Sequence, residues 1–131
     1  MFDIIVIGAG PTGLVSALTF AKAGYNVAVI DPVDRAVIAA SENSDSLQDR
    51  RTTAHLNPTV KFLADLGIWN EICCNACALE RLVIIEDTSQ NVISKRRERT
   101  VFDPLELGNQ NFGYNVPIRD NLEGLAKLVK A

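Results

Sequence analysis

The chain has 131 residues, of which 47% are hydrophobic and 22% are charged. We expect one soluble globular domain, because two full domains would need a longer chain. The 13 Lys and Arg against 16 Asp and Glu give a formal net charge of −3, and aromatic residues make up 6%. These values argue against a nucleic-acid-binding module, which usually carries a basic face or aromatic side chains that stack on bases.

Residues 2–30 have the pattern of a βαβ unit. Residues 2–7 are a β-branched run, which predicts a strand buried on both faces. After a glycine-rich turn, apolar residues recur at helical spacing, and we expect this helix to end at Gly24 in the left-handed C′ position. Residues 26–30 predict a second buried strand, which Pro32 terminates. This order of elements predicts a right-handed crossover between parallel strands.

A polar loop and a second helix are expected next. Residues 32–50 mostly lack periodicity, which predicts the loop. The helix has clear end signals: Asn57 as N-cap, Pro58 at the first helical position and Gly67 at C′. Its apolar face is expected to contain Val60, Leu63 and Leu66.

Short strands and a last helix are predicted in the rest of the chain. The strands cover residues 82–86, 92–95, 100–102 and 114–116. The first two flank the turn-rich residues 87–91, so we expect an antiparallel hairpin there. The last helix is expected to begin at Asp120, with Glu123 completing a capping box. Its buried residues are expected to be Leu122, Leu125, Leu128 and Val129.

The pattern Gly8-x-Gly10-x-x-Gly13 lies between the first predicted strand and its helix. In such a pattern the first glycine allows the tight turn and the second lets the backbone approach a pyrophosphate. The third, Gly13, lets the helix and the strand pack closely. Asp31 ends the second strand, close to the ~20-residue offset at which an acidic residue binds ribose hydroxyls. Together these residues predict an adenine-dinucleotide site.

Pro11 and Thr12 open the helix that follows this turn. The N–H groups and the positive dipole end of a helix N-terminus bind phosphate. We include both residues in the predicted cofactor site, although Pro11 itself has no N–H to donate. A carboxylate at Asp31 disfavours a 2′-phosphate, and NADP is therefore not expected in this site. The fingerprint alone leaves both NAD and FAD open.

Two later blocks of sequence resemble the flavin-dependent aromatic hydroxylases. They read Arg51-Thr52-Thr53-Ala54-x-x-x-Pro58 and Phe112-Gly113-Tyr114-Asn115-Val116-Pro117-x-Arg119. Residues 62–69 after the first block and residues 106–108 before the second fit the same family. More narrowly, the blocks resemble the branch that hydroxylates ubiquinone precursors, the 2-polyprenyl-6-methoxyphenol hydroxylases.

The resemblance implies FAD as the cofactor, NAD(P)H as the reductant and hydroxylation of a polyprenylated phenol in ubiquinone biosynthesis. Arg51 matches an arginine that contacts FAD near its pyrophosphate, and Arg119 matches an arginine near the cofactor. The family usually has an asparagine where this chain has Ile118, and Asn121 is an insertion before the leucine-rich helix. The expected fold is α/β, a Rossmann-like βαβ FAD-binding domain with a parallel sheet and an added antiparallel hairpin.

Members of this family are several times longer than this chain. We therefore expect residues 1–131 to be the N-terminal part of a truncated FAD-binding domain, without the segments that complete the flavin site and the substrate pocket. On this view the chain alone is inactive. The alternatives are a stand-alone dinucleotide-binding module or non-catalytic homologue, and another FAD- or NAD(P)H-dependent oxidoreductase.

The other polar side chains that could carry chemistry have weaker signals. Cys73, Cys74 and Cys77 are too few and too close for a disulfide framework, so we expect structural thiols in a reducing compartment and no metal site. His55, the only histidine, has no acid or nucleophile at a suitable spacing to make it a catalytic base.

Residues 95–99 form the one basic run. A solvated hairpin edge or a contact with anionic lipid accounts for it. We expect a cytoplasmic protein that touches a membrane surface, or a ubiquinone-synthesis complex, without crossing the bilayer. Self-association is also expected, because the truncated sheet should leave an unpaired edge or an apolar face.

Overall fold

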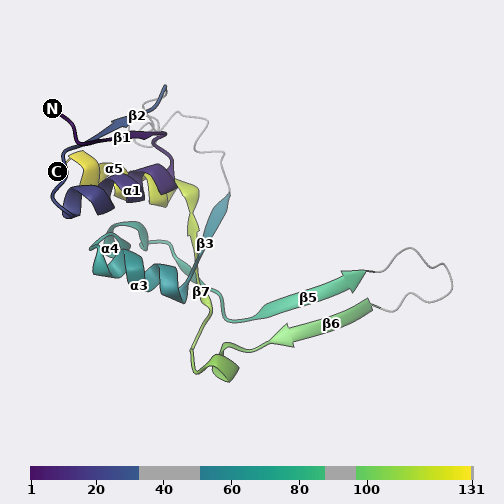
Figure 1. Ribbon diagram of the computed structural model, residues 1–131. Helices are drawn as coiled ribbons and strands as arrows, with labels where there is room; N and C mark the ends of the chain where they lie inside the picture. Colours follow the sequence, from purple (N-terminus) through teal and green to yellow (C-terminus); the bar gives the residue numbers. More distant parts are fainter. Residues whose placement is uncertain (33–50, 88–96, 131) are drawn as a thin grey trace.

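The computed structural model describes residues 1–32, 51–87 and 97–130, and Figure 1 shows how their helices and strands are arranged. In chain order these are β1 (Ile4–Ile7), α1 (Pro11–Lys22), β2 (Val27–Ile30), β3 (Thr52–Leu56), α3 (Asn57–Asp65), α4 (Trp69–Ile72), β4 (Cys77–Ala78), β5 (Leu82–Asp87), β6 (Arg97–Phe102), a 3₁₀ helix (Pro104–Leu107), β7 (Gly113–Pro117) and α5 (Ile118–Lys130). This mixture of helices and strands confirms the predicted α/β class.

Strands β1 and β2 pair in parallel and are joined by α1, as predicted. Their register runs from Ile4 opposite Val27 to Ile7 opposite Ile30. The prediction that the first strand is buried on both faces is wrong, because Ile5 is 59% and Ile7 is 86% exposed. Helix α1 packs on the sheet from one side, so the side chains that point to the other side stay exposed.

Glycines end α1 and α3 where the sequence predicts. Gly24 and Gly67 have φ values of 94° and 74°. Each helix closes with the two backbone hydrogen bonds of a Schellman motif. After α3, the Gly67 N–H donates to the Ala64 carbonyl and the Ile68 N–H donates to the Leu63 carbonyl, both at 2.8 Å.

The predicted starts of α3 and α5 are wrong. Both helices continue directly from a strand, β3 into α3 and β7 into α5. Asn57 therefore lies inside its helix rather than at the N-cap, and its Nδ2 donates to the Asn111 carbonyl at 2.7 Å. Asp120 lies within the first turn of α5 and makes no capping box, because Glu123 pairs with Arg119 instead.

A three-stranded antiparallel sheet, in the order β3-β7-β4, lies apart from the parallel pair. The strand predicted at residues 114–116 is its central member, β7. Thr52 pairs with Pro117 at one end of the β3–β7 ladder, and Leu56 pairs with Gly113 at the other. The sequence predicted β7 alone, because the hydrophobic patterns of β3 and β4 are too short to be read as strands.

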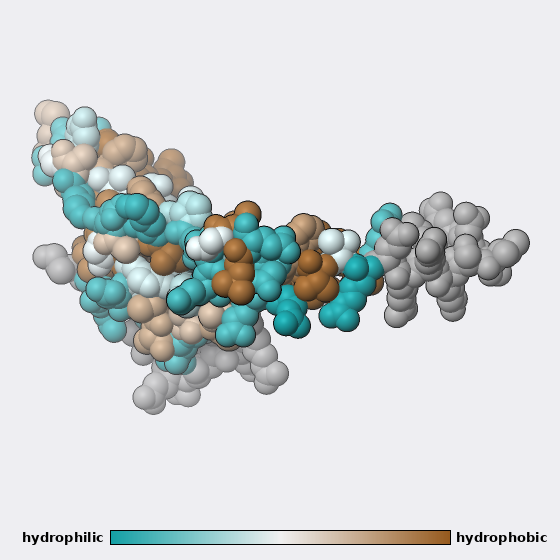
Figure 2. All heavy atoms as spheres, turned by 90° about the horizontal axis from the view of Figure 1, so that it is seen from below, coloured by the Kyte–Doolittle hydropathy of each residue, from teal (hydrophilic) through white to brown (hydrophobic). Residues whose placement is uncertain are grey.

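Strands β5 and β6 pair in antiparallel orientation, with Leu82 opposite Phe102, so the partner of β5 is residues 97–102 and not the predicted 92–95. Residues 100–102 belong to β6 rather than to a separate strand, and the strand predicted at residues 92–95 lies outside the described residues. Figure 1 shows the hairpin reaching away from the helices. Figure 2 shows apolar side chains among polar ones where the hairpin leaves the body of the molecule.

The hydrophobic core lies between the helices. It is formed by Leu14, Leu63, Ile68, Ile72 and Leu125. Helix α5 packs against both α1 and α4, and it contributes Leu125 as predicted. Val129 is 42% exposed, so the prediction from the leucine spacing that it is buried is wrong. Within the described ranges, no helix has both the length and the apolar character needed to cross a bilayer.

Candidate functional site

The glycine-rich turn between β1 and α1 has the geometry that its pattern predicts. Gly8 has a φ of 105°, a conformation that favours glycine, and its N–H donates to the Ile30 carbonyl of β2 at 2.8 Å. A Cβ atom at Gly13 would lie 1.9 Å from the carbonyl oxygen of Gly8. The structural roles of these two glycines are therefore as predicted, whereas their contact with a cofactor stays a prediction.

The start of α1 offers a place for an anion. Gly10 is the N-cap and Pro11 follows it, and neither a capping side-chain bond nor an acidic residue is found in this first turn. A Cβ atom at Gly10 would meet none of the described atoms within 4 Å, and Thr12 beside it is exposed. Because a helix N-terminus carries partial positive charge and directs N–H groups outward, this arrangement fits the diphosphate of a dinucleotide.

Asp31 lies directly after β2 and is held against the glycine-rich turn. Its Oδ2 accepts a hydrogen bond from the Ala9 N–H at 2.7 Å, and the residue is half-buried. The carboxylate therefore lies beside the residues that begin α1, at the position where the fingerprint expects an acid. Its contact with a ribose stays a prediction.

Arg51 and Arg119 lie at one end of the β3–β7 ladder. Arg51 directly precedes β3, and its carbonyl accepts a hydrogen bond from the Ile118 N–H at 3.0 Å. Arg119 follows in the first turn of α5, and its Nε donates to Glu123 one turn later. Figure 1 shows α1 and α5 running in the same direction from the side of the molecule where β3 starts. The structure thus brings the backbones of the two arginines together, and α5 packs against α1.

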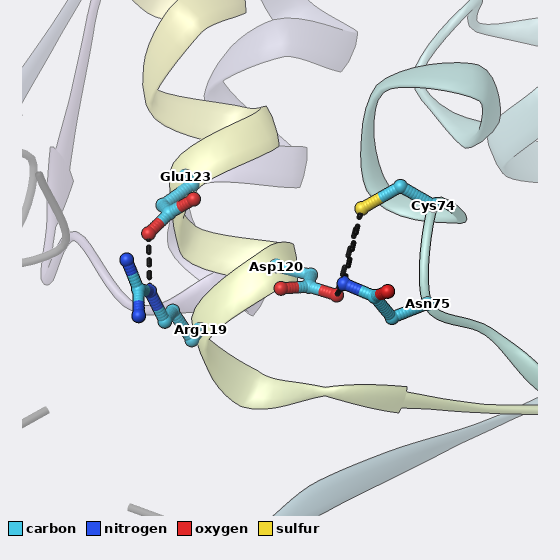
Figure 3. A network of polar contacts seen from close by, with 5 residues as sticks. All are labelled: Cys74, Asn75, Arg119, Asp120 and Glu123. Atoms are coloured by element: carbon cyan, nitrogen blue, oxygen red, sulfur yellow. Dashed lines mark hydrogen bonds and ion pairs between the residues drawn. The ribbon is translucent and has the colours of Figure 1, made fainter. Parts of the chain in front are cut away.

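Figure 3 shows how side chains hold the first turn of α5. Arg119 reaches along the helix to Glu123, whereas Asp120 faces the loop after α4. The Asp120 Oδ2 accepts a hydrogen bond from Asn75 Nδ2 at 2.9 Å and another from the Cys74 thiol at 3.6 Å.

Loss of solvent around Cys74, and then the negative charge of Asp120, raise the pKa of this thiol above its ordinary value. A protonated thiol is a poor nucleophile and a poor metal ligand. The structural role expected of Cys74 stays a prediction. In the part of the chain that the structure describes, no three His, Cys, Asp or Glu side chains are arranged to hold a metal ion.

The sequence analysis did not predict a buried polar pair that joins β3 to α5. His55 in β3 and Asn121 in α5 are 9% and 1% exposed, and 3.0 Å separates His55 Nε2 from Asn121 Oδ1. The His55 ring also packs edge-on against Trp69, with ring centroids 6.1 Å apart. A sequence signal existed only for Asn121, because it shares a helix face with Leu125 four residues later. Asn121 therefore belongs to the buried face of α5.

Comparisons with known proteins connect this geometry to a cofactor. Residues 3–61 match the family model described as FAD binding domain, a range that contains the glycine-rich turn, Asp31 and Arg51. The chain is 37% identical over 78 residues to the 6-hydroxy-3-succinoylpyridine 3-monooxygenase HspB of Pseudomonas putida (strain DSM 28022 / S16). It is also 49% identical over 35 residues to a probable flavin-containing monoamine oxidase A of Dictyostelium discoideum.

These relatives are much longer than the chain. The alignments cover 60% and 27% of this chain but only 17% and 8% of the two relatives. The p-nitrophenol 4-monooxygenase PnpA from Pseudomonas putida DLL-E4 has a similar structure, with a TM-score of 0.63 at 17% identity. That likeness covers 99% of this chain and 28% of PnpA, and at this identity it shows a shared fold alone.

The geometry and the comparisons agree on the cofactor. The range matched by the FAD-binding model begins before the glycine-rich turn and ends within α3, so it includes the open start of α1. The chain therefore carries, in residues 3–61, a segment that matches an FAD-binding domain, and its sequence is similar to part of the monooxygenase HspB.

Proposed function

We propose that this chain is the FAD-binding part of a flavin-dependent monooxygenase that hydroxylates a phenol-like aromatic ring. The observation that carries the proposal is the start of α1, where the glycine-rich turn leads into a helix end without a capping side chain in its first turn. FAD, reduced by NAD(P)H, would supply the activation of O₂ and the oxygen atom, and the residues of the chain bind and orient it. The sequence likeness to HspB supports this reaction class.

Four features of the chain would hold FAD. The N-terminus of α1 binds the diphosphate, and Asp31 accepts hydrogen bonds from the adenosine ribose. Arg51 and Arg119 donate forked hydrogen bonds to the diphosphate, because a guanidinium group matches the geometry of phosphate oxygens. Glu123 already pairs with the Nε of Arg119, so it orients this side chain along α5 and moderates its positive charge.

Gly10 gives the sharpest test of this site. Its φ of −72° suits any residue, and a Cβ there meets none of the described atoms within 4 Å, so Gly10→Val should leave the fold intact. The added side chain would fill the space beside the α1 N-terminus. We expect the affinity for FAD, measured by calorimetry, to fall at least about tenfold, which corresponds to about 1.4 kcal/mol.

A matched control is available at the other end of the same helix. Ala23→Val enlarges an exposed residue at the C-cap of α1 and should leave FAD affinity unchanged. Equal FAD affinities for the wild-type chain and Gly10→Val would show that the start of α1 does not hold the diphosphate.

The narrower substrate that we propose is a polyprenylated phenol of ubiquinone biosynthesis. The sequence blocks at residues 51–58 and 112–119 support it by their resemblance to that branch. A lipid-tailed substrate would require contact with a membrane surface, and we place this contact on the cytoplasmic side. The hairpin supports this membrane contact, because exposed Ile85 on β5 lies opposite Arg99 on β6. An apolar side chain beside a cation suits the surface of an anionic membrane.

Activity measurements on the polypeptide that carries this chain separate the candidate functions. With NAD(P)H and O₂, preferred hydroxylation of a polyprenylated phenol over p-nitrophenol and 6-hydroxy-3-succinoylpyridine supports the narrower substrate. Hydroxylation of only the two smaller rings would keep the monooxygenase and reject the ubiquinone substrate. FAD binding without any hydroxylated product would favour a stand-alone binding module, and peroxide release from an amine would favour an oxidase like the Dictyostelium relative.

A further inference from the structure

His55 and Asn121 form a buried polar pair that lies outside the proposed FAD site. The two residues lie on different elements, β3 and α5, and both are almost shielded from water. Burial of polar side chains costs free energy unless they are hydrogen bonded, and these two bond to each other. The function of the pair therefore depends on which segments it joins.

Hydrogen bonds fix the orientation of Asn121. Its Nδ2 donates to the Pro117 carbonyl at 3.3 Å and to the Val116 carbonyl at 3.5 Å. Its Oδ1 therefore faces His55, and because an amide oxygen only accepts, the Nε2 of His55 carries the proton. One side chain thus connects β3, the end of β7 and the first turn of α5.

The connected segments carry both arginines of the proposed site. The Ile118 N–H donates to the Arg51 carbonyl at 3.0 Å, which fixes the start of α5 to the start of β3. Arg119 lies two residues before Asn121 in the first turns of α5, and Figure 3 shows the Arg119 side chain on this helix. A shift of this turn relative to β3 would change the distance between Arg51 and Arg119.

We propose that Asn121, held by His55, is a positioning residue that sets the spacing of Arg51 and Arg119 for the two phosphate groups of FAD. This inference rests on the proposed function, because it takes the diphosphate as the ligand of both arginines. Forked hydrogen bonds from guanidinium groups depend on geometry as well as charge, and a site whose supporting residues are loose binds less well. The pair acts through the arginines and touches no ligand.

A double variant tests this role without a large loss of stability. In His55→Phe/Asn121→Leu, two apolar side chains of similar size replace the pair, so neither member is left buried without the other. The Pro117 and Val116 carbonyls lose only the long contacts with Asn121 Nδ2, at 3.3 and 3.5 Å. We expect the urea midpoint, followed by the fluorescence of Trp69, the only tryptophan, to stay close to that of the wild type. The affinities for FAD and ADP should fall about tenfold, whereas the affinity for AMP, which has one phosphate, should change less than about twofold.

Two further variants serve as controls. His55→Gln keeps an N–H donor toward Asn121 and should retain the FAD affinity of the wild type. Ile72→Val removes a methyl group from the same core without touching the pair, and it should leave the ratio of FAD to AMP affinity unchanged. If the double variant does not fold, the comparison of His55→Gln with His55→Phe provides the same test.

The possible outcomes distinguish this inference from the proposed function. Unchanged FAD affinity in the double variant, or equal losses of FAD and AMP affinity, would overturn the positioning role. If the polypeptide that carries this chain binds no FAD, or if its Arg51→Ala variant binds FAD as tightly as the wild type, the proposed function itself fails. If Arg51→Ala weakens FAD binding while the double variant does not, only the positioning role fails.

Discussion

The Asp31 carboxylate accepts a hydrogen bond within the protein, and it is also the group that we propose to bind a ribose. The hydrogen bond from the Ala9 N–H to its Oδ2 ties the end of β2 to the glycine-rich turn. Such a charge-assisted bond stabilises the turn, and the same carboxylate lies near the positive end of α1. A test of the ribose contact therefore has to preserve the bond to Ala9.

The variant Asp31→Asn separates these two roles, because its amide oxygen can still accept from Ala9 while the charge is lost. We expect calorimetry to show FAD binding weakened by about 1.5–3 kcal/mol, and urea denaturation to show a stability loss below about 1 kcal/mol. Asp3→Asn is the matched control, since Asp3 likewise accepts a backbone N–H, that of Asn26 at 2.8 Å, but lies at the other end of β1. Equal FAD affinity for Asp31→Asn and the wild type would contradict the assignment.

Cys74 provides a prediction about reactivity, because desolvation and the Asp120 carboxylate raise the pKa of its thiol. A raised pKa means less thiolate at a given pH, so alkylation begins only at a higher pH than for an ordinary thiol. Asp120→Asn removes the repelling charge, lowers the thiol pKa and should speed alkylation of Cys74 by iodoacetamide a few-fold at constant pH. Mass spectrometry of the labelled peptides measures this rate, with Cys77 in the same sample as an internal control. An unchanged rate at Cys74 would show that Asp120 does not control it.

At the scale of whole elements, the ends of helices were more predictable than their starts. Gly24 and Gly67 end α1 and α3 through backbone bonds within a few residues, so the local sequence contains the information. The starts of α3 and α5 depend on strands that run directly into them, and Asn57 and Asn121 use their amides for contacts far along the chain. His55 and Asn121 are 66 residues apart, a separation over which spacing rules carry no information.

The close packing of α5 on α4 leads to a prediction at this scale. A Cβ atom at Gly124 would lie 2.4 Å from the Glu71 carbonyl oxygen and 2.7 Å from the Ile72 side chain. Alanine normally stabilises a helix relative to glycine by about 1 kcal/mol, but here overpacking should reverse the sign. We expect Gly124→Ala to lower the free energy of unfolding by about 2 kcal/mol in urea denaturation. Lys127→Ala, an exposed change in the same helix, should alter it by less than about 0.5 kcal/mol, and a stabilised Gly124→Ala would contradict this packing.

At the scale of the molecule, the α/β class and the parallel βαβ unit followed from local patterns, whereas the division of the described strands into three small sheets did not. Short strands such as β4 acquire their identity only from the strand they pair with, which lies far along the chain. The prediction that both faces of β1 are buried was wrong for a related reason. A β-branched run is compatible with two buried faces, but whether a second layer covers the strand depends on residues elsewhere.

The exposed face of the β1–β2 sheet leads to the last prediction, self-association of the chain. Ile7 and Ile30 are neighbours across the two strands, and both are more than half exposed, as is Ile5 on β1. Contiguous apolar surface favours association, because each Å² removed from water contributes about 25 cal/mol. We expect light scattering to show a mean mass that rises with protein concentration. The double variant Ile5→Thr/Ile7→Thr should suppress this rise, and it keeps β-branched residues in the strand.

Leu105→Thr, on the exposed 3₁₀ helix, is the control for a general loss of apolar surface. A wild-type chain that stays monomeric at every concentration, or a variant that associates as strongly, would show that this face is not the contact.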